Sequence, residues 1–469
     1  MSLLAKVFFP TLARRERQGL AGGLGLLIGG ALLVSGVFHG LVTTNFESQA
    51  HDGYLQLARS LAQGQGYRFS ENGPLVLFRP PAYVALLLPM VLMPAAWQPV
   101  LVILLNSVLF WGAGCLVYLV TRDLFSPAVA RLAVLLLWCN GNILWCLKNP
   151  MSWILQIFAM AALAYAFWRV ARSAQPAVSA LGLGAVAGAA ILTHGAFLVI
   201  FAVLAASTGL GIAWSKAWGK IIPWGLACAM AGLIVLPWTW RNYVVSGRFI
   251  PVVEGAGQAY FMGNAIAGLP PLDPATPPPP HLFIYSDDIA ALEMAGLDKS
   301  LASGCLYGGY PGVDTEQKLD RAMLQDLRRQ PLWLIPKFIY NGLQLFFPAL
   351  HYVWRSPVYR PASPISTIVL YDWAISLWNL AGWIFAGWGW RSLASRNQRL
   401  GYLGLLGGIA AYMVPYMLLS SASIHAAYTF PAYALLMPLT AVGLEQLVGR
   451  RRSAGAASSM MSGSNARPG

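Results

Sequence analysis

Charged side chains are scarce in this sequence. Asp, Glu, Lys and Arg together make up 10% of its 469 residues, whereas an average soluble domain carries roughly 25%. This scarcity excludes an ordinary soluble globular protein. The net charge of +14 does not indicate nucleic acid as a partner, because the basic residues stand largely in short segments between apolar runs, as in cytoplasmic loops of membrane proteins.

The sequence also lacks a cysteine framework and internal repeats. Only five cysteines occur, four of them within apolar runs, and their spacing fits neither a set of disulfides nor a metal site. We therefore assign no metal ligands. The sequence requires no cofactor, and it leaves a need for a divalent metal open.

Long apolar runs are what the sequence has in abundance. Hydrophobic residues make up 57% of the chain, and runs of about 20 residues recur, each long enough to cross a bilayer as a helix. We predict an all-α polytopic membrane protein with about 10–12 transmembrane helices. The expected spans are 20–42, 100–120, 128–147, 151–170, 178–193, 195–213, 219–237, 366–389, 400–420 and 425–445. Two further apolar segments, 82–96 and 332–350, contain prolines, and we expect them to make no net crossing.

The positions of Lys and Arg predict the topology. Basic residues flank both termini and several short turns, which places those segments in the cytoplasm. The prediction divides the chain into a cytoplasmic N-terminal tail (1–19), an N-terminal membrane module (20–238) with a first extracytoplasmic loop (43–81), a large extracytoplasmic loop (239–331), C-terminal membrane helices (332–448) and a disordered cytoplasmic tail (449–469).

One stretch of the large loop has a clear helical pattern. In the segment DTEQKLDRAMLQDLRRQP, Leu319, Met323 and Leu327 recur every four residues, which predicts an amphipathic helix. The proline-rich stretch PPLDPATPPPPHLF before it cannot be helical.

Few carboxylates are available for chemistry on the extracytoplasmic side. Outside the large loop only Glu47, Asp52, Glu71 and Asp372 are expected there. Apolar residues recur at helical spacing just after Asp52, so a short helix should begin at this residue. Asp52 could cap that helix. It could also be a general base, because partial burial at the membrane boundary raises the pKa of a carboxylate; Glu47 is the second choice for this role.

Basic residues on the extracytoplasmic side are the second signal. Arg79, Lys148, Arg241 and Arg248 all fall where the distribution of positive charge disfavours them, and His194 joins them at the end of a predicted span. A cation held there usually has a partner, and a phosphate group is a natural one for guanidinium. Anchoring to lipid head groups or pairing with a loop acid is the alternative for each residue.

Several motifs in order resemble one enzyme group. The segments R-P-P-A-Y (79–83), P-W-T-W-R-N-Y (237–243), G-R-F-I-P-V (247–252), G-N (263–264) and IHAAYTFPAYALLMP (424–438) follow the first loop NFESQAHDGYLQLARSLAQGQGY. This set resembles the GT-C superfamily of polyprenyl-phosphate-sugar glycosyltransferases, in particular bacterial proteins similar to dolichyl-phosphate-mannose-protein mannosyltransferases and lipid A aminoarabinose transferases. The likeness covers most of residues 20–445.

The resemblance implies an enzyme of the inner (plasma) membrane that acts on the extracytoplasmic face. It would move a sugar from a polyprenyl-phosphate donor to a lipid, glycan or protein acceptor, with inversion, using Asp52 as the catalytic residue. The implied donor-phosphate ligands are Arg79, Arg241, Lys148 and His194, and the candidate substrate contacts are Tyr54, Tyr67, His425 and Tyr428.

The sequence departs from the family pattern at two arginine positions. His194 stands where the family has the Arg of L-T-R, and Ala427 stands where an Arg precedes the final Tyr428. Two other classes of protein therefore remain as alternatives. One is a transporter or flippase for a lipid-linked anion, which would favour charges or broken helices at mid-span. The other is a non-catalytic membrane scaffold, which the lost arginines favour.

Overall fold

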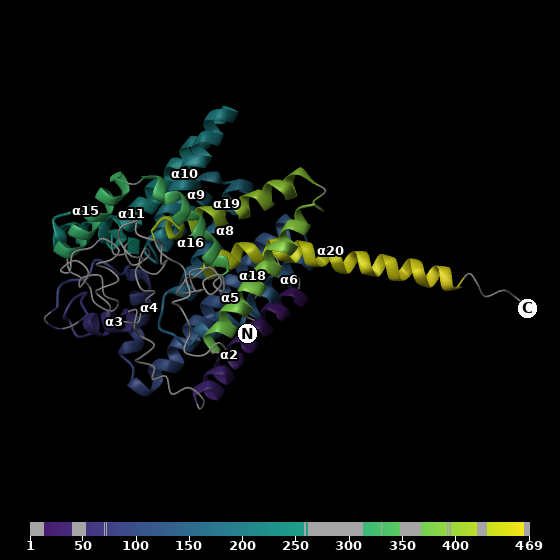
Figure 1. The fold of residues 1–469 in the computed structure, drawn as a ribbon, viewed down its shortest axis with the longest axis horizontal. Helices are drawn as coiled ribbons and strands as arrows, with labels where there is room; N and C mark the ends of the chain where they lie inside the picture. The colour runs from purple at the N-terminus through teal and green to yellow at the C-terminus, as the bar shows by residue number, and fades with distance from the viewer. Residues whose placement is uncertain are drawn as a thin grey trace, which may run out of the picture.

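All regular secondary structure in the part of the chain that the structure describes is helical (Figure 1). This is a computed structural model, and it describes residues 14–39, 53–69, 71, 73–257, 259–260, 313–329, 331–347, 367–391, 393, 395–419 and 429–463. No strand occurs among these residues. The chain is an all-α polytopic membrane protein, as its composition predicts.

The principal helices follow the apolar runs closely. They are α2 (Arg14–His39), α3 (Tyr54–Ala62), α4 (Pro81–Val91), α5 (Gln98–Leu124), α6 (Pro127–Trp138), α7 (Gly141–Cys146), α8 (Trp153–Arg172), α9 (Pro176–Ile191), α10 (Ala196–Ser215), α11 (Ile221–Ser246), α15 (Val313–Arg329), α16 (Leu334–Phe346), α18 (Thr367–Trp390), α19 (Arg396–Leu419) and α20 (Phe430–Gly463).

Five segments of the described chain are long and apolar enough to cross a membrane. They are Ala95–Leu124, Trp153–Arg172, Ala196–Ser215, Trp218–Ser246 and Gln398–Met417. Four shorter apolar helices accompany them: Gln18–Gly30, Pro81–Val91, Pro127–Trp138 and Pro176–Ile191. The number of 10–12 spans stays a prediction.

The core lies where α5, α6, α8 and α20 pack together, with α18 against α20 and α9 against α11. The contact between α9 and α11 depends on two glycines. A Cβ atom on Gly184 would lie 2.3 Å from the carbonyl oxygen of Ala227, and one on Gly188 would lie 2.7 Å from the Cβ of Ile234. Two glycines four residues apart let helix backbones approach closely, as in many membrane helix pairs.

The expected span 128–147 is wrong as a single helix. It is two helices, α6 and α7, which are separated at Asn140. The Asn140 side chain accepts hydrogen bonds from the backbone N–H groups of Asn142 (3.1 Å) and Ile143 (3.3 Å). This N-cap separates the two helices. The Asn140 side chain accepts from backbone N–H groups that, in a continuous helix, would donate to carbonyl oxygens of the preceding turn.

Two predicted boundaries also differ from the structure. The large loop was expected to start at 239, but α11 continues to Ser246 and ends where Gly247 adopts a φ of 67°. Pro237 lies inside this helix without ending it. The C-terminal tail, expected to be disordered from 449, continues α20 to Gly463, and this end of the helix extends away from the bundle in Figure 1.

The amphipathic helix of the large loop is confirmed. Helix α15 contains Leu319 and Met323, whose side chains are buried. It packs against the segment that follows α11, where a Cβ on Gly257 would lie 2.5 Å from the Leu319 backbone. This close approach places α15 beside the segment that follows α11 and contains Arg248.

Candidate functional site

Helix α3 begins at Tyr54, two residues after the predicted catalytic acid. Its N-cap is Gly53, with a φ of 80° and no capping side chain. Gly53 is required here because φ is positive and because a Cβ would lie 2.2 Å from the Phe69 ring.

The first residue of α3 joins a buried polar chain. The Ser152 hydroxyl donates a hydrogen bond to the Tyr54 hydroxyl (3.1 Å), and the Gln156 amide donates to Ser152 (2.9 Å). All three side chains are buried. The chain thus connects the first loop to the N-terminal turn of α8.

The polar chain continues across the bundle to His194. The Tyr412 hydroxyl lies 3.5 Å from the side-chain amide oxygen of Gln156 and 3.2 Å from the Tyr416 hydroxyl, within hydrogen-bond distance of both. The Tyr416 hydroxyl lies 3.3 Å from Nδ1 of His194, and the two rings stack. The backbone N–H of Ala196 also donates to this Nδ1 (3.2 Å). His194, in the turn between α9 and α10, is therefore held in one orientation.

Arg79 and Tyr67 lie on the other side of Tyr54. The Arg79 guanidinium carbon lies 5.4 Å from the Tyr54 ring centre and 4.4 Å from that of Phe78. The Tyr67 hydroxyl donates to the carbonyl oxygens of Arg79 and Pro80, both at 3.1 Å. Burial raises the pKa of Tyr67 well above its ordinary value, so the phenol keeps the proton that it donates. Tyr67 therefore fixes the R-P-P turn.

Arg241 approaches the same turn from α11. Its guanidinium carbon lies 5.3 Å from the Tyr67 ring and 4.9 Å from the Trp238 ring. Its Nη1 donates to the Val76 carbonyl oxygen (2.7 Å) and to the Asn242 side chain (3.1 Å). Arg241 therefore has a structural role, because its hydrogen bond to Val76 connects the first loop to α11. This role is separate from anion binding.

Lys148 is positioned indirectly, through Asn106 on α5. The fully buried Asn106 amide donates to the carbonyl oxygens of Leu147 (2.9 Å) and Asn149 (3.0 Å), and its oxygen accepts from the Tyr83 hydroxyl (3.2 Å). The Tyr83 ring in turn packs edge-on against Tyr54. Burial lowers the pKa of the half-buried Lys148 ammonium.

The structure thus connects six of the predicted site residues through one set of contacts, which we call the outer cluster: Tyr54, Tyr67, Arg79, Lys148, His194 and Arg241. Asp52, Glu47, His425 and Tyr428 lie outside the described residues. Among the described residues no group of three or more His, Cys, Asp or Glu side chains could hold a metal ion.

Sequence reasoning missed the side chains that link this cluster. Gln156, Tyr412 and Tyr416 lie in apolar helices, and Ser152 is the N-cap of one of them. A polar side chain in a membrane span was the available signal. Tyr412 and Tyr416 are also four residues apart, so that they share one face of α19.

Arg248 has a different environment from the one predicted for an anion ligand. It forms an ion pair with Glu254, and its Nη2 lies 3.4 Å from the Asp320 carboxylate on α15. Asp320 also accepts from the backbone N–H of Gly257 (3.0 Å). The alternative of pairing with a loop acid is therefore correct for Arg248, which fastens α15 to the end of α11.

No family model and no curated protein matches this chain. Solved structures that are similar to it include the oligosaccharyltransferase AglB from Archaeoglobus fulgidus in complex with an inhibitory peptide and a dolichol-phosphate, at 14% identity and a TM-score of 0.48 over 96% of this chain. The chain spans about half of that protein (52%). ArnT from Cupriavidus metallidurans bound to undecaprenyl phosphate is similar over 92% of this chain and 79% of its own, at 14% identity and a TM-score of 0.36.

Proposed function

We propose that this protein is an integral membrane glycosyltransferase that moves a sugar from a polyprenyl-phosphate donor to an acceptor hydroxyl or phosphate on the extracytoplasmic face. The observation that carries the proposal is that Tyr67 contacts both Arg79 and Arg241: its hydroxyl donates to the Arg79 carbonyl oxygen, and its ring lies 5.3 Å from the Arg241 guanidinium carbon. These arginines come from separate parts of the sequence, and both stand against aromatic rings of the first loop and α11. Guanidinium groups suit a phosphate because they bind its oxygens in pairs.

The proposed reaction is a single displacement. An acceptor oxygen attacks the anomeric carbon while the bond from that carbon to the phosphate oxygen breaks, which inverts the configuration. Asp52 accepts the proton of an acceptor hydroxyl. Arg79 and Arg241, with Lys148, offset the charge that develops on the leaving phosphate.

The outer cluster suits this role because its side chains are fixed before any substrate binds. Tyr67 holds the backbone of Arg79, the Asn106 amide holds the turn of Lys148, and Tyr416 holds the His194 ring. Groups that are already oriented stabilise developing charge without reorganisation during the reaction. His194 would contact the donor phosphate in place of the family arginine.

The test is substitution of the two candidate acids. Asp52→Asn should lower transfer from a polyprenyl-phosphate sugar by roughly 10²–10⁴-fold, the usual contribution of a general base, while binding of a polyprenyl phosphate is kept. Glu47→Gln is the matched control. A loss confined to Glu47→Gln would move the base to Glu47, and normal transfer by both variants would remove the first loop from the mechanism.

A further inference from the structure

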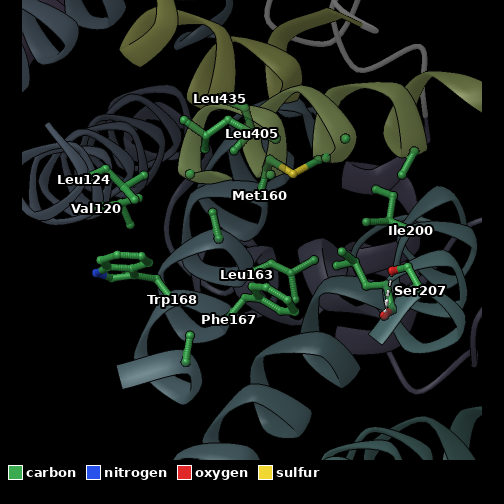
Figure 2. A pocket seen from close by; sticks show the side chains of 18 of the residues that line it. Val120, Leu124, Met160, Leu163, Phe167, Trp168, Ile200, Ser207, Leu405 and Leu435 are labelled. Atoms are coloured by element: carbon green, nitrogen blue, oxygen red, sulfur yellow. Dashed lines mark hydrogen bonds between the residues drawn. The ribbon is translucent and has the colours of Figure 1, made fainter. Parts of the chain in front are cut away.

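A second feature lies among the same helices, away from the outer cluster. A cavity of about 680 Å³ is lined by α5, α8, α10, α19 and α20 (Figure 2). Most of its wall is apolar, including Met160, Leu163, Phe167 and Ile200. It runs along α8 from Met160 to Arg172, towards the end of that helix predicted to face the cytoplasm. Its size falls within the range of about 300–1,000 Å³ that is typical of ligand sites.

Glycines of α19 hold this cavity open. A Cβ on Gly401 would lie 2.5 Å from Leu124, and one on Gly408 would lie 2.8 Å from Leu435, so these two glycines let α19 pack closely on α5 and α20. Between them, Gly404 and Gly407 line the cavity and have no atom within 4 Å of a built Cβ. Helix contacts on both sides therefore maintain a space that α19 leaves unfilled.

The end of the cavity carries a positive charge. Arg172 lies in its wall, with the guanidinium carbon 4.2 Å from the centre of the Trp168 ring. The nearby Asp123 is paired with Arg122 at 3.0 Å and accepts the Trp168 indole N–H at 3.4 Å. Among the described residues Arg172 has no carboxylate partner. A tryptophan beside a cation is typical of the level of lipid head groups.

We propose that this cavity binds one acyl chain of an anionic phospholipid, with the lipid phosphate at Arg172. Inside a bilayer the gain comes from van der Waals contact, because an unfilled space beside a helix has no partner atoms. The charge at one end favours an anionic head group, which the cytoplasmic leaflet supplies and basic residues attract. The inference is independent of the proposed transfer activity.

The test fills the cavity from the glycine side. The full-length protein in detergent is titrated with phosphatidylglycerol or phosphatidylcholine, and its Tm and retained lipid are measured, the latter by native mass spectrometry. The wild type should retain one phosphatidylglycerol and gain several degrees in Tm. In Gly404→Leu/Gly407→Leu the added side chains occupy the space, so both effects should be lost. The control is Gly209→Leu. Gly209 is an exposed glycine on α10 that does not line the cavity, so this variant should behave like the wild type.

A second variant keeps the test decisive if the double substitution prevents folding. Arg172→Gln leaves the cavity intact and should reduce the preference for phosphatidylglycerol over phosphatidylcholine by about tenfold, as expected from loss of one charge-assisted hydrogen bond. Equal stabilisation of the filled variant and the wild type by phosphatidylglycerol would overturn the proposal. So would an unchanged lipid preference in Arg172→Gln.

Discussion

Two fully buried polar side chains, Asn106 and Glu316, have opposite environments. Asn106 uses both ends of its amide, with three hydrogen bonds to Tyr83, Leu147 and Asn149. Glu316, on α15, is equally buried, but neither of its carboxyl oxygens has a hydrogen-bond partner. A satisfied buried group fixes its surroundings, whereas an unsatisfied one costs free energy and is retained for another reason.

The charges around Glu316 make the difference sharper. Asp320 and Glu254 lie nearby, and Arg248 is the facing cation. Burial is the main cause that raises the pKa of Glu316 to about 8, and the two acids raise it further. The outer cluster thus keeps one geometry. Glu316, in contrast, changes its charge at about pH 8, close to the ion pair of Arg248 and Asp320 that fastens α15.

The largest expected effect comes from removing the satisfied group. Asn106→Leu would leave the Tyr83 hydroxyl and two backbone carbonyl oxygens without their partner, at a cost of about 1–3 kcal/mol for each buried unpaired group. The free energy of unfolding should fall accordingly, and transfer should be lost because the turn of Lys148 shifts. Denaturation in mixed micelles would measure it.

The neighbouring Ser107 supplies the control for that variant. Its buried hydroxyl has no hydrogen-bond partner, so Ser107→Ala should change the unfolding free energy little. A loss as large as that of Asn106→Leu would show that this part of α5 is sensitive to any substitution.

The next effect separates the two arginines of the outer cluster. Arg79→Ala and Arg241→Ala should each weaken binding of a polyprenyl phosphate by about 1.5–3 kcal/mol, the value of a hydrogen bond to a charged group. Arg241→Ala should in addition lower Tm, because it loses the 2.7 Å hydrogen bond to Val76. Lys148→Ala should weaken binding less, since an ammonium makes a point contact. Unchanged binding in both arginine variants would assign these residues to packing alone.

The third effect is expected at Glu316. Between the ordinary pKa of 4.5 and the raised value of about 8, the folded protein binds more protons than the unfolded chain. Stability should therefore fall as pH rises through this window and level off above it. Glu316→Gln should remove this part of the slope and raise Tm by a few degrees at pH 9, where the wild-type carboxylate is charged.

Thermal unfolding from pH 4 to pH 9 would measure this difference. The exposed Glu71 gives a matched control in Glu71→Gln, which should keep the wild-type slope. A Glu316→Gln variant with the same pH dependence as the wild type would refute a role for this carboxyl group.

The smallest effect is expected in the polar chain that reaches His194. Tyr416→Phe removes one hydroxyl that contacts Tyr412 and the imidazole, which should cost about 0.5–1.5 kcal/mol of stability, the net value of a typical hydrogen bond. The donor affinity should fall as well if the orientation of His194 matters for binding. An unchanged affinity would separate His194 from the donor site.

The sequence was sufficient for features that depend on local patterns. Apolar runs predicted the helices, and the spacing of Leu319 and Met323 predicted the buried face of α15. The expected distribution of positive charge selected three exceptions: Arg79, Arg241 and Lys148. The fold connects these residues through Tyr67, Tyr54 and Asn106.

What the sequence could not predict depends on contacts between distant segments. Gln156 and Tyr412 are 256 residues apart, so no local pattern joins them. The same reason applies to Arg248, whose partner Asp320 lies 72 residues later. The end of α11 differs from the expected boundary at 239 because the helix continues through polar residues to Ser246, where Gly247 ends it.

The close contact of α9 and α11 has a consequence for how this protein can change over time. Arg241 lies on α11 and His194 directly follows α9, so the separation of these two side chains depends on how near the helices approach. Gly184 and Gly188 set that approach, against Ala227 and Ile234. A larger residue at 184 would meet the backbone carbonyl of Ala227, which no substitution at 227 removes, and it would therefore spread the helices. Position 184 is thus expected to stay glycine in related sequences that keep the same spacing at the outer cluster.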